Sequence, residues 1–139
     1  MLKLSKKVEY GMIALQYIAE NPEKKISAKE MSDKLNISFE FLSKTLQQLM
    51  KRGLIESWKG LKGGYALAKS PQEISVADVI DALDGNTSIV DCIDEQRELG
   101  CTRDEFCTIR HNMMGLQLEI NNVFNNITLA EMLKLSNLN

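Results

Sequence analysis

Apolar residues recur every three or four positions in the first twenty residues of the chain. A repeat of this kind predicts a helix with one buried face. Ser5 can cap its first turn and Pro22 stops it, so the helix should span residues 5–20. Its apolar stripe consists of Val8, Met12, Leu15 and Ala19.

Two further helices follow in close succession. Ser27 and Glu30 have the spacing of a capping box, which predicts a helix from residue 27 to about residue 35. After a short break at residues 36–37, a third helix should begin at Ser38 and end before Gly53. Together the two helices predict a helix-turn-helix. The inward face of the third helix should consist of Phe39, Leu42, Leu46 and Leu49.

The opposite face of the third helix is polar and contains Glu40 as its acid. Solvation alone would account for such a face. Its short, amide and basic side chains can, however, also reach the edges of DNA bases. From this helix we therefore assign five candidate DNA-binding residues: Ser38, Ser43, Lys44, Gln47 and Lys51.

Residues 54–58 and 65–68 have the composition of two short strands, and the turn between them is rich in glycine and lysine. This arrangement predicts a β-hairpin, which beside a helix-turn-helix is the wing of a winged helix. Lys59 and Lys62 lie in the turn, where they can contact DNA phosphates or the adjacent minor groove. The glycine spacing matches neither a P-loop nor a dinucleotide-binding fingerprint, so a nucleotide site is not predicted.

The second half of the chain begins where Pro71 interrupts the pattern. Ser75 can cap a short helix that Gly85 ends, with Val76, Val79, Ile80 and Leu83 facing inward. Residues 86–110 have no apolar repeat and contain many acids. We expect them to form an acidic loop.

A longer helix should run from about His111 to Asn126, because apolar residues there alternate at steps of three and four. The stripe is wider than a helix needs if it packs only on its own domain, although that alternative stays open. Thr128 and Glu131 form a capping box for a last short helix. We expect the stripe to form a dimer interface through Met113, Leu116, Ile120 and Val123.

These elements predict a mainly α-helical protein with a small β-hairpin, organised as a winged helix-turn-helix plus a long dimerisation helix. Residues 1–84 should form the DNA-binding region, residues 85–110 a cysteine loop, and residues 111–139 the dimerisation helix and a C-terminal helix. With 139 residues the chain can bury a core of its own. We therefore expect one compact domain that needs no metal in order to fold.

The net charge of −2 hides an uneven distribution. Residues 1–70 carry 13 Lys or Arg against 7 Asp or Glu, a net charge of +6, whereas residues 71–139 carry 4 against 12, a net charge of −8. Two ordinary solvated surfaces would explain this difference. The alternative is a basic half directed at phosphates and an acidic half kept away from them.

Three cysteines, Cys92, Cys101 and Cys107, fall within sixteen residues, and the single histidine, His111, follows them. Thiolates with a nitrogen donor nearby suit zinc or an iron–sulfur cluster. The longest apolar run, residues 11–19, is far shorter than the ~20 residues of a membrane span, and no signal-peptide pattern opens the chain. We therefore expect a cytoplasmic protein without a membrane partner, in which three cysteines favour metal binding or redox sensing over structural disulfides.

The chain resembles the Rrf2 family of bacterial transcriptional regulators over essentially its whole length. The resemblance rests on residues 4–10, the helix-turn-helix at 37–54, the wing at 59–67 with its Gly-Gly-Tyr, residues 74–80, and the three-cysteine loop. It implies a homodimer in which a long helix of each subunit pairs with its mate. It also implies a 2Fe-2S or 4Fe-4S cluster held by Cys92, Cys101 and Cys107.

Two spacings depart from the family pattern. Eight residues separate Cys92 from Cys101, against five in IscR-like and NsrR-like members, and His111 lies four residues after Cys107 rather than three. The cluster type and the fourth ligand therefore stay open between His111 and Glu9 of the partner subunit, which stands where NsrR-like members have an acidic ligand. Ser43 replaces the base-reading acid of IscR-like proteins, so the operator should differ.

We therefore predict a homodimeric, DNA-binding transcriptional regulator of a palindromic operator, controlled by an iron–sulfur cluster that senses iron, nitric oxide or redox state. The alternative is a zinc-bound or thiol-redox-switched regulator without an iron–sulfur cluster. An enzyme is not expected, because the chain has one histidine, no nucleophile motif and no cofactor fingerprint.

Overall fold

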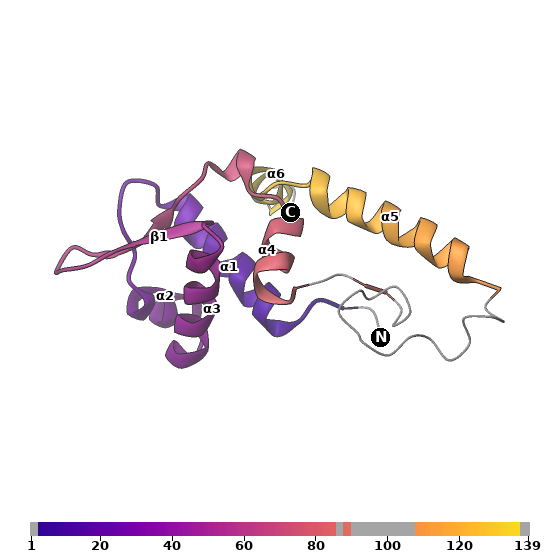
Figure 1. Cartoon of the computed structure of the whole chain (residues 1–139). Coiled ribbons are helices and arrows are strands. Elements are labelled where there is room, and N and C mark those ends of the chain that lie inside the picture. The colour runs from indigo at the N-terminus through magenta and orange to yellow at the C-terminus, as the bar shows by residue number, and fades with distance from the viewer. Residues whose placement is uncertain (1–2, 86–87, 90–107, 137–139) are drawn as a thin grey trace.

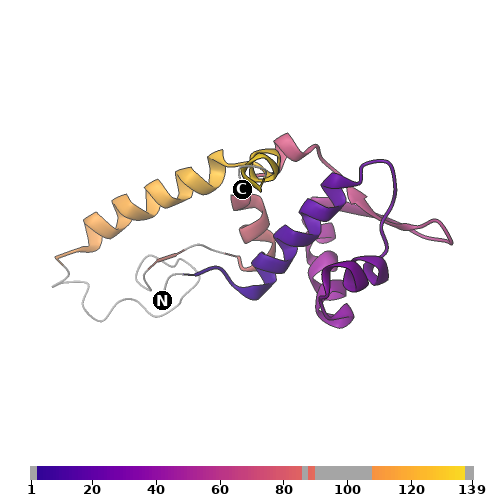
Figure 2. The same cartoon turned by 180° about the vertical axis from the view of Figure 1, so that it is seen from behind.

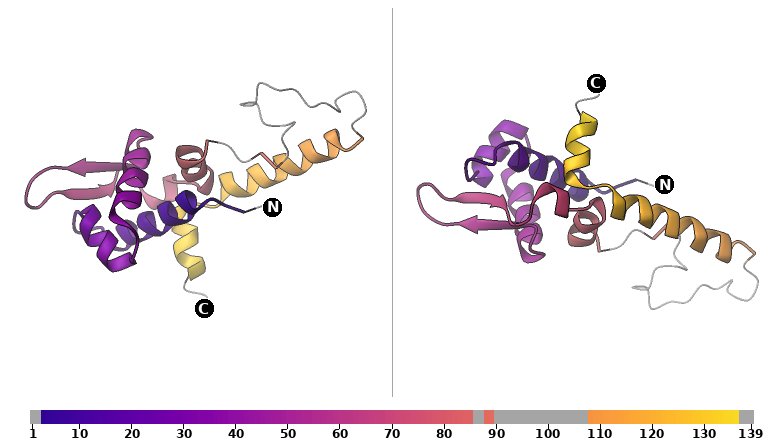
Figure 3. Two further views of the ribbon diagram at one scale, coloured as in Figure 1. Left: turned by 90° about the horizontal axis from the view of Figure 1, so that it is seen from below. Right: turned by 90° about the horizontal axis from the view of Figure 1, so that it is seen from above.

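The computed structural model describes residues 3–85, 88–89 and 108–136 of the chain (Figure 1). Within these residues the order of elements is α1 (Lys6–Glu20), α2 (Ala28–Leu35), α3 (Phe39–Lys51), β1 (Ile55–Trp58), β2 (Gly64–Leu67), a 3-10 turn η1 (Pro71–Glu73), α4 (Val76–Leu83), α5 (Arg110–Asn126) and α6 (Leu129–Ser136). The predicted architecture, mainly α with a small hairpin, is confirmed. The hairpin and α5 project from opposite ends of a body of packed helices (Figure 3).

Side-chain caps set where the first two helices begin. The Ser5 hydroxyl accepts a hydrogen bond from the Val8 N–H at 3.3 Å and donates one to the Asp84 carboxylate at 2.8 Å, which ties the start of α1 to the end of α4. The Ser27 hydroxyl likewise accepts from the Glu30 N–H at 3.0 Å. The predicted reciprocal half of that capping box is wrong, because the Glu30 carboxylate lies 2.7 Å from the Lys24 ammonium instead.

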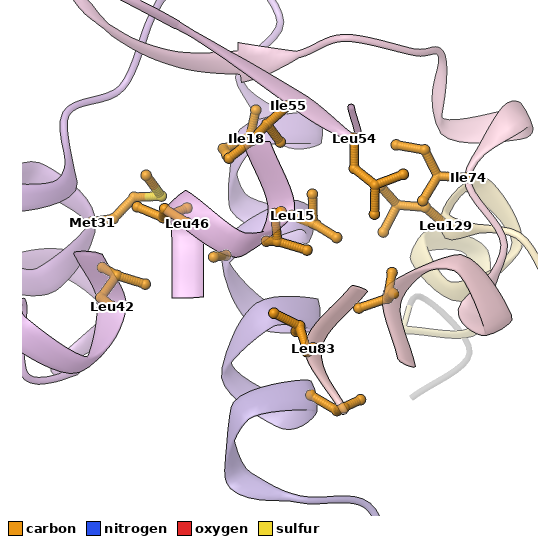
Figure 4. Packing of buried hydrophobic residues seen from close by; sticks show 14 of the residues in the cluster. Leu15, Ile18, Met31, Leu42, Leu46, Leu54, Ile55, Ile74, Leu83 and Leu129 are labelled. Atoms are coloured by element: carbon orange, nitrogen blue, oxygen red, sulfur yellow. The ribbon is translucent and has the colours of Figure 1, made fainter. Parts of the chain in front are cut away.

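The core forms where α1, α3 and α4 meet, and β1 and α6 close it (Figure 4). Gly11 allows the closest approach, since a Cβ at this position would overlap the side chain of Leu83. On α3 the predicted inward residues Leu42, Leu46 and Leu49 are fully buried. The fourth, Phe39, is not: it is 52% exposed, and its neighbours Ser38 and Glu40 are exposed as well, so the start of α3 lies outside the core.

The wing is an antiparallel pair that aligns Ile55 with Leu67 and Trp58 with Gly64. The first strand begins one residue later than predicted, and the second covers Gly64–Leu67 rather than residues 65–68. Backbone hydrogen bonds of 3.0 and 2.7 Å between Ile26 and Tyr65 add the segment before α2 to the second strand. Gly64 adopts a φ of +148°, and a Cβ there would meet the Ile26 backbone at 2.6 Å. The glycine thus allows this three-segment contact.

The end of the chain returns to the first half. Val76 N donates to Ile127 O at 2.9 Å and Leu129 N donates to Ile74 O at 2.8 Å, so the segments leading into α4 and α6 pair side by side. Leu129 is buried in the common core. The capping box of Thr128 with Glu131 is confirmed by its two hydrogen bonds, of 3.3 and 3.2 Å.

Three further differences from the sequence predictions concern the connections. Pro71 does not simply break the chain, because Pro71–Glu73 forms a 3-10 turn with Ser70 and Glu73 as its capping box. The long helix starts at Arg110, one residue before His111. Residues 90–107, most of the predicted acidic loop, lie outside the described residues. In the part of the chain that is described, no helix has the length and apolarity needed to cross a membrane.

Candidate functional site

The polar face of α3 is turned away from the core because the opposite face is buried. Lys44, Gln47 and Lys51 are exposed, and Ser43 is half-buried beside them. Ser38 is the N-cap residue of α3, but its hydroxyl makes no capping hydrogen bond, so its side chain is available at the start of the helix. The structure therefore leaves Ser43, Lys44, Gln47 and Lys51 on the side of α3 that faces away from the core, with Ser38 exposed at its start.

The wing lies at the same end of the molecule as α2 and α3, opposite α5 (Figure 2). Lys59 and Lys62 are exposed in its turn, and Leu61 between them is fully exposed. Lys44, Lys51, Lys59 and Lys62 take part in none of the ion pairs among the described residues. Their charges are therefore not neutralised within this part of the chain, and they can attract a polyanion.

The segment before α2 adds residues that sequence reasoning missed. The Lys25 ammonium lies 3.8 Å from the centre of the Trp58 ring, within range of a cation–π contact. Trp58 is half exposed at the end of β1. A groove of about 680 Å³ separates this segment from the wing, and Lys24, Lys25, Trp58 and Lys62 contribute to its lining. The Lys24-Lys25 pair was visible in the sequence. Its position beside the wing was not, because the backbone pairing of Ile26 with Tyr65 brings it there.

Lys24 differs from the lysines of the wing because it forms an ion pair. Its ammonium lies 2.7 Å from the Glu30 carboxylate, and this hydrogen bond holds the pKa of Glu30 below its ordinary value and raises the pKa of Lys24. The Tyr17 hydroxyl also donates to Glu30, at 3.5 Å. The net charge of the groove is therefore smaller than its lysine content implies.

Of the candidate metal ligands, the structure describes Glu9 and His111, whereas Cys92, Cys101 and Cys107 lie outside the described residues. Glu9 is in the first turn of α1, half exposed, with its carboxylate 3.0 Å from the Lys6 ammonium. The hydrogen bond and charge of Glu9 raise the pKa of Lys6. His111 is exposed in the first turn of α5.

These two side chains fit a ligand role, since both donors are accessible. An exposed ion pair such as Lys6–Glu9 is weak and exchanges readily, so the carboxylate is free to serve another cation. Within the described residues, no three histidine, cysteine, aspartate or glutamate side chains are grouped so as to hold a metal ion. Any such site therefore requires donors from residues 90–107 or from a second chain.

Helix α5 presents apolar side chains to solvent. Leu116 and Val123 are about half exposed, whereas Met113 and Ile120 are half-buried. Leu118, on another side of the helix, is 63% exposed. Exposed apolar area of this extent on one element is typical of a protein–protein contact surface.

The residue that α5 does bury is polar. Gln117 is 6% exposed; its side-chain oxygen accepts from the Ile89 N–H at 2.8 Å, and its amide donates to Asn121 at 2.9 Å. Ile89 is the last described residue before the segment that contains Cys92. The Gln-x-x-x-Asn spacing was visible in the sequence, but the backbone partner 28 residues away was not.

Comparison with known proteins agrees with this architecture. The family model Rrf2, described as an iron-dependent transcriptional regulator, matches residues 4–135. The chain is 31% identical over 123 residues to the transcriptional regulator NsrR of Shouchella clausii, covering 86% of this chain and 82% of that protein. It is 32% identical over 132 residues to IscR of Serratia proteamaculans, covering 94% and 79%.

Among solved structures, that of CymR, the global cysteine regulator of B. subtilis, superposes with a TM-score of 0.76 at 27% identity. The superposition covers 96% of this chain and 98% of CymR. The similarity therefore extends from the winged helix through the long helix and the C-terminal helix.

Proposed function

The chain belongs to the Rrf2 family, whose members are transcriptional regulators and not enzymes, and we propose that it binds operator DNA as a homodimer under the control of an iron–sulfur cluster. The observation that carries the proposal is the shared exposure, at one end of the molecule, of the polar face of α3 and the unpaired lysines of the wing. This end reads DNA. The opposite end, α5, assembles the dimer.

In this proposal α3 enters a major groove, where Ser43, Lys44 and Gln47 face base edges and Ser38 and Lys51 lie nearer the phosphates. Lys59 and Lys62 of the wing contact phosphates or the adjacent minor groove. The dimer axis requires a palindromic operator with half-sites ~34 Å apart or a multiple of that distance. Residues 1–84 are the DNA-binding region.

The exposed stripe of α5 supports the homodimer. Two copies of the stripe can cover each other by two-fold symmetry, which removes from water the apolar side chains that one chain leaves exposed. Met113, Leu116, Ile120 and Val123 form the centre of this contact. Residues 111–139 thus supply the interface and the helix that returns to the core.

Cys92, Cys101 and Cys107, in the loop of residues 85–110, would hold a 2Fe-2S or 4Fe-4S cluster, with Glu9 of the partner subunit or His111 as the fourth ligand. The family description as iron-dependent and the chemistry of three thiolates support this assignment. When bound, the cluster supplies a centre whose integrity depends on iron supply, nitric oxide and redox state. Glu9 lies at the start of α1, which packs on α3, so a ligand there links the sensor to the reading helix.

A second candidate is a zinc-bound or thiol-redox regulator without an iron–sulfur cluster. The similarity to CymR, described as a global cysteine regulator, favours it. Three thiolates and His111 would also supply the four ligands that a tetrahedral zinc site requires.

The visible spectrum of protein purified without oxygen separates the two candidates. A brown protein with iron and sulfide in stoichiometric amounts supports the cluster, and each of Cys92→Ala, Cys101→Ala and Cys107→Ala should then lose most visible absorbance. Thr108→Ala, next to Cys107, is the matched control and should keep it. Stoichiometric zinc without visible absorbance would establish the alternative.

The fourth ligand is tested by visible circular dichroism of Glu9→Ala and His111→Ala. A changed spectrum for Glu9→Ala alone supports ligation across the dimer, and a change for His111→Ala alone assigns the histidine. Glu20→Ala, an exposed acid at the other end of α1, is the control for a general effect of charge. DNA binding is tested separately, by selection of duplexes from a random-sequence pool.

A further inference from the structure

Phe39 is an aromatic residue at an unusual place. It is the first residue of α3 and is 52% exposed, although its spacing from Leu42 and Leu46 predicts burial. On the helix surface it stands one turn before Ser43, at the border between the buried face and the polar face. The polar surface of α3 thus has an apolar edge at its N-terminal end.

The other phenylalanine of α3, Phe41, packs against the rest of the chain. Phe41 packs against Tyr10 of α1 in an edge-on contact, with 5.4 Å between ring centroids. Within the described residues, Phe39 makes no ring contact of this kind. The two phenylalanines of α3 therefore have different environments, and Phe39 is the one exposed at the edge of the polar surface of α3.

The major groove of DNA offers one apolar group on its base edges, the 5-methyl of thymine. The N-terminal residues of a recognition helix are the ones that contact base edges. We propose that Phe39 specifies thymine in each half-site by packing its ring against this methyl group. The assignment rests on the proposed function, since it requires α3 to enter the major groove.

Thymine and uracil differ by this methyl alone, which allows a direct test. An operator is first selected from a random-sequence pool, and each thymine of its half-sites is then replaced by deoxyuridine. At one position the wild-type protein should lose affinity by about three- to fivefold per methyl, the effect of uncovering roughly one buried carbon. Replacement in both half-sites should cost about nine- to twenty-fivefold, because the two losses multiply.

Phe39→Ala should bind the thymine operator less tightly and should lose the discrimination between thymine and uracil at that position. Phe39→Leu, which retains an apolar side chain, should keep part of it. Ser43→Ala is the comparison variant: it should weaken binding and leave the thymine-to-uracil ratio at the Phe39 position unchanged. Helical circular dichroism and sedimentation measure whether all three variants fold and assemble as the wild type does, which is the expected result.

Failures of the two proposals are distinguishable. If no duplex is selected, the proposed function is wrong and this assignment falls with it. If a duplex is selected but every thymine-to-uracil change costs the same in wild type and Phe39→Ala, the assignment alone is overturned. A Phe39→Ala protein with altered oligomeric state and an unaltered ratio overturns it as well, because the ring then belongs to a protein interface.

Discussion

Helices α3 and α5 have similar apolar spacing in the sequence but bury opposite kinds of side chain. Helix α3 covers Leu42, Leu46 and Leu49 and exposes Gln47 and two lysines. Helix α5 covers Gln117 and leaves Leu116 and Leu118 in solvent. The same pattern has two outcomes because α3 is surrounded by its own chain, whereas α5 extends away from the helical body (Figure 1). Apolar side chains left exposed by one chain indicate cover by another.

The largest expected effect concerns the α3 side of this comparison. Leu46→Ala removes a fully buried side chain at the centre of the core and should lower the free energy of unfolding by about 2–5 kcal/mol. The same substitution at the fully exposed Leu61 should change it by less than about 0.5 kcal/mol. Urea denaturation followed by circular dichroism measures both. Similar losses in the two variants would contradict the assignment of the core to α3.

The second prediction tests the apolar surface of α5. Leu116→Asp places a charge in the centre of the proposed interface and should raise the dimer dissociation constant about a hundredfold, or about 2.8 kcal/mol. The fold of each subunit should persist, because Leu116 is about half exposed in the single chain. Sedimentation measures the dissociation constant. Asn122→Asp, an exposed position of the same helix, is the control for added charge; equal effects would argue against the stripe.

The third prediction concerns the polar residue that α5 buries. Gln117→Met keeps the length of the side chain but leaves the Ile89 N–H without its acceptor, which should cost about 1–2 kcal/mol of stability. Hydrogen exchange at the Ile89 amide should become faster. Gln47→Met, the same change on the exposed face of α3, should affect stability by less than about 0.5 kcal/mol. An unchanged exchange rate at Ile89 would show that the hydrogen bond is not formed in solution.

The same two helices show what could be predicted from the sequence. Helical periodicity located the core residues of α3 because packing against the chain's own elements follows from spacing alone. It failed at Phe39, since the burial of a first-turn residue depends on which neighbouring segments reach it. It could not reveal the burial of Gln117, whose partner is a backbone N–H distant in sequence. The candidate ligands Cys92, Cys101 and Cys107 were identified from residue type and remain predictions.

The fourth prediction compares the wing with α6 through the salt dependence of DNA binding. Lys62→Ala removes one unpaired positive charge from the wing of each subunit, so the slope of log affinity against log salt should fall by about 0.9 per subunit of the bound dimer, the equivalent of one phosphate contact in each half-site. The loss should be similar for all DNA sequences, because phosphate contacts carry no sequence information. Lys134→Ala, on α6, is the matched control and should leave the slope unchanged. Fluorescence anisotropy at several salt concentrations measures these slopes.

The smallest effect is expected at Lys24, a lysine of the proposed DNA-binding end that already forms an ion pair. Its contact with Glu30 should reduce its contribution to DNA binding, so Lys24→Ala should change the salt slope less than Lys62→Ala does. Glu30→Gln removes the competing carboxylate and should increase the salt slope and the DNA affinity slightly.

The pH dependence of DNA binding follows from the lowered pKa of Glu30, which the Lys24 hydrogen bond causes. A carboxyl group with a lowered pKa stays charged through the neutral range, and the pairing is lost only as the pH falls through that lowered value. Affinity should therefore respond to Glu30→Gln at pH 7 but not to small pH changes around it. A salt slope that falls equally in Lys24→Ala and Lys62→Ala would show that DNA displaces Glu30 from Lys24, and that both lysines act as phosphate contacts.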